Sequence, residues 1–157
     1  MKIDHINIVV ADLERSAAFY EQVFGLKRGF SATLEGEWIE TVTDLHNVRA
    51  TCLFLENDAG GTRIELIRYD APTGEKCSFH TLPNTLGVRH IAFEVENMAQ
   101  VLEKLSALGR ESLSEPIEVP FLVGNLGRKF LCYFHDPDGT LLEIAAYEPI
   151  SSKPANG

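Results

Sequence analysis

The sequence of 157 residues has little cysteine, no basic run and no long hydrophobic stretch. Its three cysteines, Cys52, Cys77 and Cys132, are odd in number and lack C-x-x-C spacing, which argues against a disulfide framework or a thiolate zinc site. Reduced thiols fit a cytoplasmic protein.

There are 14 basic residues against 23 acidic ones, a formal net charge of -9, so neither nucleic acid nor an anionic membrane is an expected partner. No apolar run approaches the roughly 18 residues of a membrane span, and Asp4 and His5 interrupt any signal core.

What the sequence does contain is an internal repeat, and a repeat of this kind determines the architecture. The segment DHINIVVADLERSAAFYEQVFGL, residues 4–26, aligns with RHIAFEVENMAQVLEKLSALG, residues 89–109. Each copy begins with an alternating strand that carries a histidine, passes through Asp12 or Asn97 as a helix N-cap, and ends its helix at a glycine. Each copy then continues into further strands, so each predicts a β-α-β-β-β module.

Two glutamates interrupt strands that are otherwise typical of a buried sheet. Glu65 lies in GTRIELIRY, and Glu143 has the matching position in GTLLEIAAY. Side chains alternate along a strand and the apolar set must face the helix, so both glutamates, with His5 and His90, project from the face that the helices leave uncovered. A buried carboxylate needs a partner. Arg63 is the only arginine beside Glu65 and nothing basic flanks Glu143 on its own strand, so few alternative cations are expected on this face.

A divalent metal would satisfy both carboxylates at once. Two imidazole nitrogens and two carboxylate oxygens suit Ni²⁺, Co²⁺, Zn²⁺, Fe²⁺ or Mn²⁺, and octahedral geometry leaves positions for water or substrate. Taken singly, a histidine in a strand is usually structural; the four residues together fall at equivalent points of the repeat, which favours a metal. The expected ligands are His5, Glu65, His90 and Glu143. By contrast, His46 and His80 lie in polar loops and are expected to be surface residues.

The expected fold class is α+β, with two tandem βαβββ modules forming curved mixed sheets around a metal cleft and the helices on the outer faces. Residues 1–148 form a single domain in this interpretation: module one spans 1–70, a polar linker 71–86, and module two 87–148. The tail, residues 149–157, is expected to be flexible.

The paired modules, the DHINIVVADLERSAAFYEQVFGL opening, the GVRHIAFEVENM restart and the FHDPDGTLLEI close resemble the vicinal oxygen chelate superfamily. That group includes glyoxalase I, methylmalonyl-CoA epimerase, extradiol dioxygenases, fosfomycin-resistance transferases and bleomycin-binding proteins. The resemblance covers residues 1 to about 148 and implies the same four metal positions. It also implies a homodimer and a small-molecule substrate with vicinal oxygens; whether each site is built within one chain or across two stays open.

The four-ligand set is similar to the glyoxalase pattern and close to the epimerase pattern. The resemblance therefore implies a metal-dependent isomerase or lyase that abstracts a proton next to a metal-chelated carbonyl, with Glu65 or Glu143 as the base. The alternatives are an extradiol ring-cleaving dioxygenase, which a fourth ligand disfavours, and a non-catalytic bleomycin-resistance type of binding protein, which generally lacks the ligands. Glutathione-dependent members typically carry an arginine on the cleft side of the first strand, and Val9 stands at that position, which argues against glutathione as the thiol. Whether glutathione or coenzyme A takes part stays open.

The hairpin sequence DPDG, residues 136–139, predicts a three-residue loop with a bulge. That register sets Tyr133 opposite Glu143 on the cleft face and sends Cys132 and Phe134 to the helix side, whereas a two-residue loop would reverse the assignment. Tyr133 is then a candidate hydrogen-bond donor to bound substrate.

Two long segments, residues 31–47 and 114–129, are interpreted as loops at the mouth of the pocket. Further candidate substrate contacts are Asn7, Trp38, Arg49 and Lys129.

Overall fold

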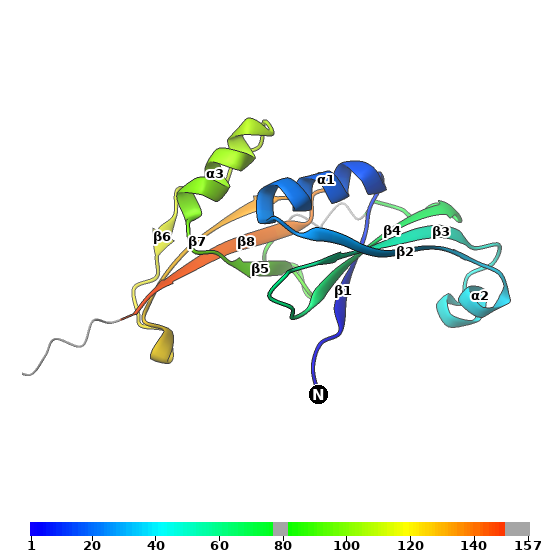
Figure 1. The fold of residues 1–157 in the computed structure, drawn as a ribbon, viewed down its shortest axis with the longest axis horizontal. Coiled ribbons are helices and arrows are strands. Elements are labelled where there is room, and N and C mark those ends of the chain that lie inside the picture. Colours follow the sequence, from blue (N-terminus) through cyan, green and yellow to red (C-terminus); the bar gives the residue numbers. More distant parts are fainter. Residues whose placement is uncertain (77–81, 150–157) are drawn as a thin grey trace, which may run out of the picture. The chain divides into compact units, whose positions relative to one another are not determined.

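The computed structural model describes residues 1–76 and 82–149. The chain divides into two compact units, Met1–Ser78 and Phe79–Gly157. Each unit contains one four-stranded mixed sheet and one longer helix (Figure 1). The predicted α+β fold with two βαβββ modules is confirmed. The expectations for His80, Cys77 and the tail beyond residue 149 lie outside the described residues.

Unit one pairs its first strand with its last. In chain order its elements are β1 (His5–Val9), α1 (Leu13–Phe24), β2 (Lys27–Glu35), α2 (Glu37–Thr43), β3 (Arg49–Glu56) and β4 (Arg63–Ala71). The strand order is β1-β4-β3-β2, with β1 parallel to β4 and the other neighbours antiparallel. This pairing brings Asn7 opposite Glu65.

Unit two repeats the topology. Its elements are β5 (His90–Glu94), α3 (Met98–Ala107), β6 (Ile117–Glu118), the 3₁₀ helix η1 (Gly124–Leu126), β7 (Arg128–His135) and β8 (Leu141–Glu148). The strand order is β5-β8-β7-β6, and β5 is parallel to β8. Ala92 lies opposite Glu143, as Asn7 lies opposite Glu65 in unit one.

Both predicted helix starts are confirmed. The side chain of Asp12 accepts a hydrogen bond from the Arg15 amide at 3.0 Å, and that of Asn97 accepts one from the Gln100 amide at 3.0 Å. These bonds satisfy amides that have no partner in the first turn. Gly25 follows α1 with φ 70°, a left-handed conformation that favours glycine. None of the described helices is long and apolar enough to cross a membrane.

Strand alternation sorts the sheet of unit one into two faces. Ile8 and Val10 of the first strand segment are buried, whereas His5 and Val9 are exposed. The helix α1 packs on β3 and β4. The fully buried large side chains of unit one include Tyr20, Val23, Leu55 and Leu66. Each of these contributes roughly 2 kcal/mol of transfer free energy, so the packing of α1 against the sheet fixes which face stays open.

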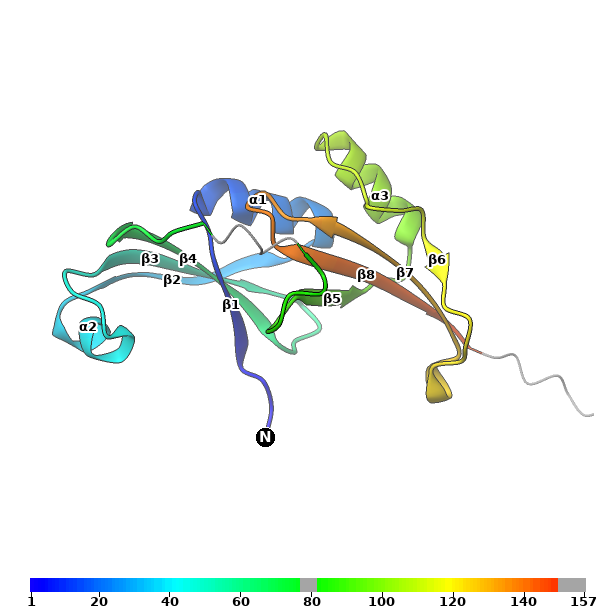
Figure 2. The same ribbon diagram turned by 180° about the vertical axis from the view of Figure 1, so that it is seen from behind.

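The helix α2 was not predicted, and the interpretation of residues 31–47 as a loop is wrong. The strand β2 continues to Glu35, and α2 follows at once (Figure 2). Ile39 of α2 is buried in a cluster with Val48, Ala50, Cys52 and Ile67, on the sheet face that α1 leaves uncovered. A helix of seven residues with one buried side chain gives too weak a periodic signal to be read from sequence.

The DPDG hairpin has the predicted three-residue loop. The Gly139 amide donates to the Asp136 carbonyl at 3.1 Å, and the Asp136 amide donates to the Thr140 carbonyl at 3.0 Å. Gly139 has φ 93°, which places the bulge residue where glycine is favoured.

This loop fixes the register of β7 and β8. Tyr133 lies directly opposite Glu143, while Cys132 and Phe134 are buried on the other face. The predicted register and face assignment are therefore confirmed.

Candidate functional site

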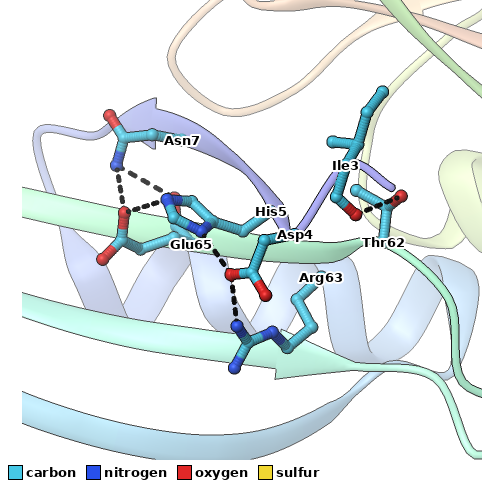
Figure 3. Close-up of polar contacts among 7 residues, drawn as sticks. All are labelled: Ile3, Asp4, His5, Asn7, Thr62, Arg63 and Glu65. Carbon is cyan, nitrogen blue, oxygen red and sulfur yellow. Dashed lines mark hydrogen bonds and ion pairs between the residues drawn. The ribbon is translucent and has the colours of Figure 1, made fainter. Parts of the chain in front are cut away.

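In unit one, His5 and Glu65 face each other across the first and last strands (Figure 3). His5 Nε2 lies 3.4 Å from Glu65 Oε2, and the Glu65 side chain is 13% exposed. Asn7 Nδ2 donates to the same carboxylate oxygen at 3.1 Å and lies 3.3 Å from the Glu65 carbonyl oxygen. The predicted substrate contact Asn7 thus holds the carboxylate of Glu65.

Asp4 orients the ring of His5 from the other side. Its Oδ2 accepts hydrogen bonds from His5 Nδ1, at 2.8 Å, and from Arg63 Nη2 (Figure 3). The bonds from His5 and Arg63 lower the pKa of the Asp4 carboxyl. With the proton on Nδ1, the Nε2 lone pair of His5 is available to a cation. Sequence reasoning missed this role, although an aspartate directly before the histidine was a readable signal.

In unit two, His90 and Glu143 form the equivalent pair, with Nε2 and Oε2 3.3 Å apart. The Glu143 side chain is only 3% exposed. Its second oxygen, Oε1, lies 2.6 Å from Lys129 Nζ. Nothing basic flanks Glu143 on its own strand, as predicted, but the expectation of few alternative cations on this face overlooked Lys129, which reaches Glu143 from the neighbouring strand β7.

The contact between Lys129 and Glu143 is an ion pair. It joins Nζ of the lysine to the buried oxygen Oε1 of the glutamate. Burial alone would lower the pKa of Lys129, but the carboxylate of Glu143 outweighs it and the pKa is raised. Lys129 is therefore an ammonium ion at neutral pH.

An aromatic ring on the adjacent strand stands opposite each glutamate. In unit one it is Phe54, whose ring meets that of His5 edge-on with centroids 5.5 Å apart. In unit two it is Tyr133, with its ring centroid 5.2 Å from that of His90. Burial, followed by the carboxylate of Glu143, raises the pKa of the Tyr133 hydroxyl, so this group stays protonated and able to donate.

The residue before each histidine differs between the units. Arg89 precedes His90 where Asp4 precedes His5. The Nε and Nη1 atoms of Arg89 are buried and have no hydrogen-bond partner among the described residues. Unlike His5, His90 therefore has an arginine rather than a carboxylate before it.

Two other predicted substrate contacts lie on α2 and at the start of β3 in unit one. Trp38 is on α2 and is 57% exposed. Arg49 begins β3, five residues before Phe54, which places it about 16 Å along the strand from the residue opposite Glu65. His46 is exposed, as predicted.

The two described cysteines, Cys52 and Cys132, are buried free thiols. Burial raises the pKa of both, that of Cys132 to about 11. Neither is therefore a reactive thiolate, and catalysis by a cysteine nucleophile has no support from these two residues.

The donor spacing within each unit suits a metal. Two donors that each lie about 2.1 Å from one ion are about 3.0 to 3.4 Å apart at angles between 90° and tetrahedral. The spacings of 3.4 and 3.3 Å fall in this range. Each unit by itself contributes two donors, and no group of three or more His, Cys, Asp or Glu side chains that could hold a metal occurs within residues 1–76 and 82–149.

Two βαβββ units, each with a histidine on its first strand and a glutamate on its last, define a class of duplicated-module proteins that present paired nitrogen and oxygen donors. The family model described as Glyoxalase/Bleomycin resistance protein/Dioxygenase superfamily matches residues 2–144. The chain belongs to this superfamily.

The relatives support this assignment over nearly the whole chain. A glyoxalase family protein from Bacillus cereus has a solved structure that is similar with a TM-score of 0.80 and 29% identity, over 94% of each chain. Glyoxylase I 4 of Arabidopsis thaliana is 28% identical over 158 residues, covering 99% of this chain and 76% of that protein. The mitochondrial methylmalonyl-CoA epimerase of Homo sapiens is 26% identical over 145 residues, covering 91% and 72%.

Proposed function

We propose that the protein is a divalent-metal-dependent isomerase or lyase of the glyoxalase or epimerase type. The observation that carries the proposal is the recurrence of one His–Glu pair, at nearly the same spacing, in both units. The proposed ligands of a single Ni²⁺, Co²⁺, Zn²⁺, Fe²⁺ or Mn²⁺ ion are His5, Glu65, His90 and Glu143. When bound, the ion would supply Lewis-acid chemistry to a substrate with vicinal oxygens, which makes the C–H next to its carbonyl more acidic. A homodimer in the cytoplasm is part of the same proposal.

Glu65 is the better placed of the two glutamates to accept the substrate proton. Its Oε2 faces His5 and the neutral amide of Asn7, while its Oε1 has no hydrogen bond or ion pair within the described part of the chain. Glu143 has His90 on one oxygen and the ammonium of Lys129 on the other. A base needs an oxygen free to reach the proton, so this difference supports Glu65 as the base and Glu143 as a fixed ligand.

Tyr133 is the proposed hydrogen-bond donor to bound substrate. Its raised pKa keeps the hydroxyl protonated, and its ring lies beside His90. Trp38 and Arg49 are proposed to contact the distal part of a large substrate, since Trp38 is exposed on α2 and Arg49 lies at the start of β3.

Solvent deuterium exchange tests the proposal. The metal-loaded protein is incubated in D₂O with the hemithioacetal of methylglyoxal, with an acyl-CoA thioester or, as a control without a C–H next to a carbonyl, with a catechol. Deuterium incorporation into each probe is measured by NMR. We expect exchange with one of the first two probes, only when metal is present. Glu65→Gln should keep most of the bound metal and lose deuterium exchange, whereas Glu143→Gln should keep part of the exchange. Exchange that survives complete removal of metal would refute the mechanism.

A non-catalytic binding protein is the second candidate, and one contact favours it. Because Lys129 already neutralises Glu143, the buried carboxylate of unit two does not require a metal. Such a protein would bind an aromatic or antibiotic molecule without turnover and with the same affinity before and after chelator treatment. Metal analysis of the purified protein, followed by calorimetry with and without chelator, separates the two functions.

A further inference from the structure

We propose that Lys129 is an internal cation that neutralises Glu143 in the metal-free protein and competes with the metal for this carboxylate. The inference rests on the proposed metal site. Two consequences follow. The chain remains folded without metal, and it binds metal more weakly than the same four ligands would without Lys129.

The geometry of the carboxylate carries the first step. Glu143 Oε2 points to His90 Nε2, at 3.3 Å, and Oε1 points to Lys129 Nζ, at 2.6 Å. With 3% of the Glu143 side chain exposed, water cannot compensate its charge. A buried carboxylate without a partner would be strongly unfavourable, so the lysine fulfils a requirement that a metal would otherwise meet.

The placement of the lysine carries the second step. Lys129 lies opposite Tyr147 and Tyr133 lies opposite Glu143, so the Leu131–Ala145 pair stands between them on the same face. The lysine side chain therefore extends along the strand to reach the carboxylate, and it is itself only 20% exposed. A side chain held in this way adds a positive charge directly beside the proposed metal position, which disfavours a divalent cation there.

Among residues 1–76 of unit one, no lysine is placed in this way. The residue of β3 that corresponds to Lys129, four positions before the aromatic residue opposite the glutamate, is Ala50. Glu65 is instead held by the neutral amide of Asn7 and retains some contact with solvent. The competing cation is thus a property of unit two alone.

The test compares Lys129→Met, Lys129→Arg and a matched control, Lys27→Met. Lys27 forms an ion pair with Asp58 in which both side chains are exposed, so its removal controls for loss of a lysine charge. Two quantities are measured for each purified protein: the dissociation constant for Co²⁺, by chelator competition, and the urea midpoint of the metal-free form. We expect Lys129→Met to bind Co²⁺ about tenfold more tightly and to unfold at lower urea without metal. Lys129→Arg and Lys27→Met should stay near wild type in both measurements.

Weaker or unchanged Co²⁺ binding by Lys129→Met, in a background where the wild type binds Co²⁺, would overturn the inference and leave the proposed function standing. Absence of Co²⁺ binding by the wild type would instead overturn the proposed function. If Lys129→Met does not fold without metal, two further results decide. Refolding of this variant on addition of Co²⁺ supports the inference. If Co²⁺ does not restore folding, and Lys129→Gln binds Co²⁺ no more tightly than the wild type, the inference is overturned.

Discussion

The His–Glu pair of unit one and that of unit two have nearly the same spacing and very different surroundings. In unit one the histidine is supported by Asp4 and the glutamate by the amide of Asn7. In unit two the corresponding positions are occupied by Arg89 and Ala92, and the glutamate is held by Lys129. The donors are retained in both copies of the repeat, whereas the residues that control the donors differ.

In the proposed mechanism this difference separates the roles of Glu65 and Glu143. The charge of Glu65 is moderated by a neutral partner and some solvent, which leaves one oxygen free to move. The charge of Glu143 is fixed in place by an ammonium ion in a buried setting. A duplicated architecture can therefore keep a symmetric set of ligands and still assign proton transfer to one half.

The largest expected effect tests whether the two pairs act together. If four ligands bind one ion, His5→Ala and His90→Ala should each weaken Co²⁺ binding by about a hundredfold or more, since each removes a direct ligand. The wild type should then bind one ion per chain by calorimetry. Two ions per chain, with each variant losing only one of them, would show that the units bind metal separately.

The next prediction compares the two glutamates in the absence of metal. Glu143→Gln leaves the ammonium of Lys129 without its anion, whereas Glu65→Gln keeps an amide next to Asn7 in a partly wet site. We expect Glu143→Gln to lower the free energy of unfolding by about 2 kcal/mol more than Glu65→Gln. Urea unfolding of the chelator-treated proteins measures this difference, and equal costs would mean that the two surroundings are energetically alike.

A third prediction concerns the residue before each histidine. Asp4→Ala should weaken Co²⁺ binding by about tenfold, because the carboxylate fixes the orientation of the His5 ring through Nδ1. Arg89→Ala, at the equivalent position of unit two, should not weaken it, since an arginine gives no such support. Chelator competition with both variants decides the matter, and equal losses would contradict the asymmetry.

The smallest expected effect is a pH dependence that comes from a thiol of unit two. Burial raises the pKa of Cys132 to about 11 from 9.0, so the unfolded chain loses this proton first as the pH rises. The free energy of unfolding is therefore unaffected by this thiol below about pH 9 and declines between pH 9 and pH 11. At pH 10 it is lower by about 1.4 kcal/mol. Cys132→Ala should reduce this decline in urea unfolding, whereas Ile144→Val, a truncation on the neighbouring strand, should retain it in full. An unchanged decline in Cys132→Ala would show that other groups cause it.

Local patterns in the sequence were sufficient for much of the fold. Strand alternation gave the faces of β1 correctly, the polar residues Asp12 and Asn97 marked both helix starts, and the DPDG hairpin fixed Tyr133 opposite Glu143. Each of these features depends on neighbours within a few residues, which is why a single sequence reveals them.

The contacts that were missed depend on tertiary packing. Ile39 is buried because it packs on sheet residues that are distant in the sequence, such as Ile67. The seven residues of α2 therefore do not predict the helix by themselves. Lys129 reaches Glu143 along the strand past an intervening residue pair, a contact that strand pairing alone does not reveal. The ligand roles of the four donor residues and the substrate contacts remain predictions.

The parallel pairing of β1 with β4, and of β5 with β8, also determines when each donor pair can form. In both units the histidine lies on the first strand and the glutamate on the last, so the contact closes a loop that spans almost the entire unit. Such a long closure comes late in folding, because its entropy cost is recovered only after the intervening strands have paired. During synthesis the histidine of each unit is made well before the glutamate, so the His–Glu contact cannot form until the last strand of that unit has been added.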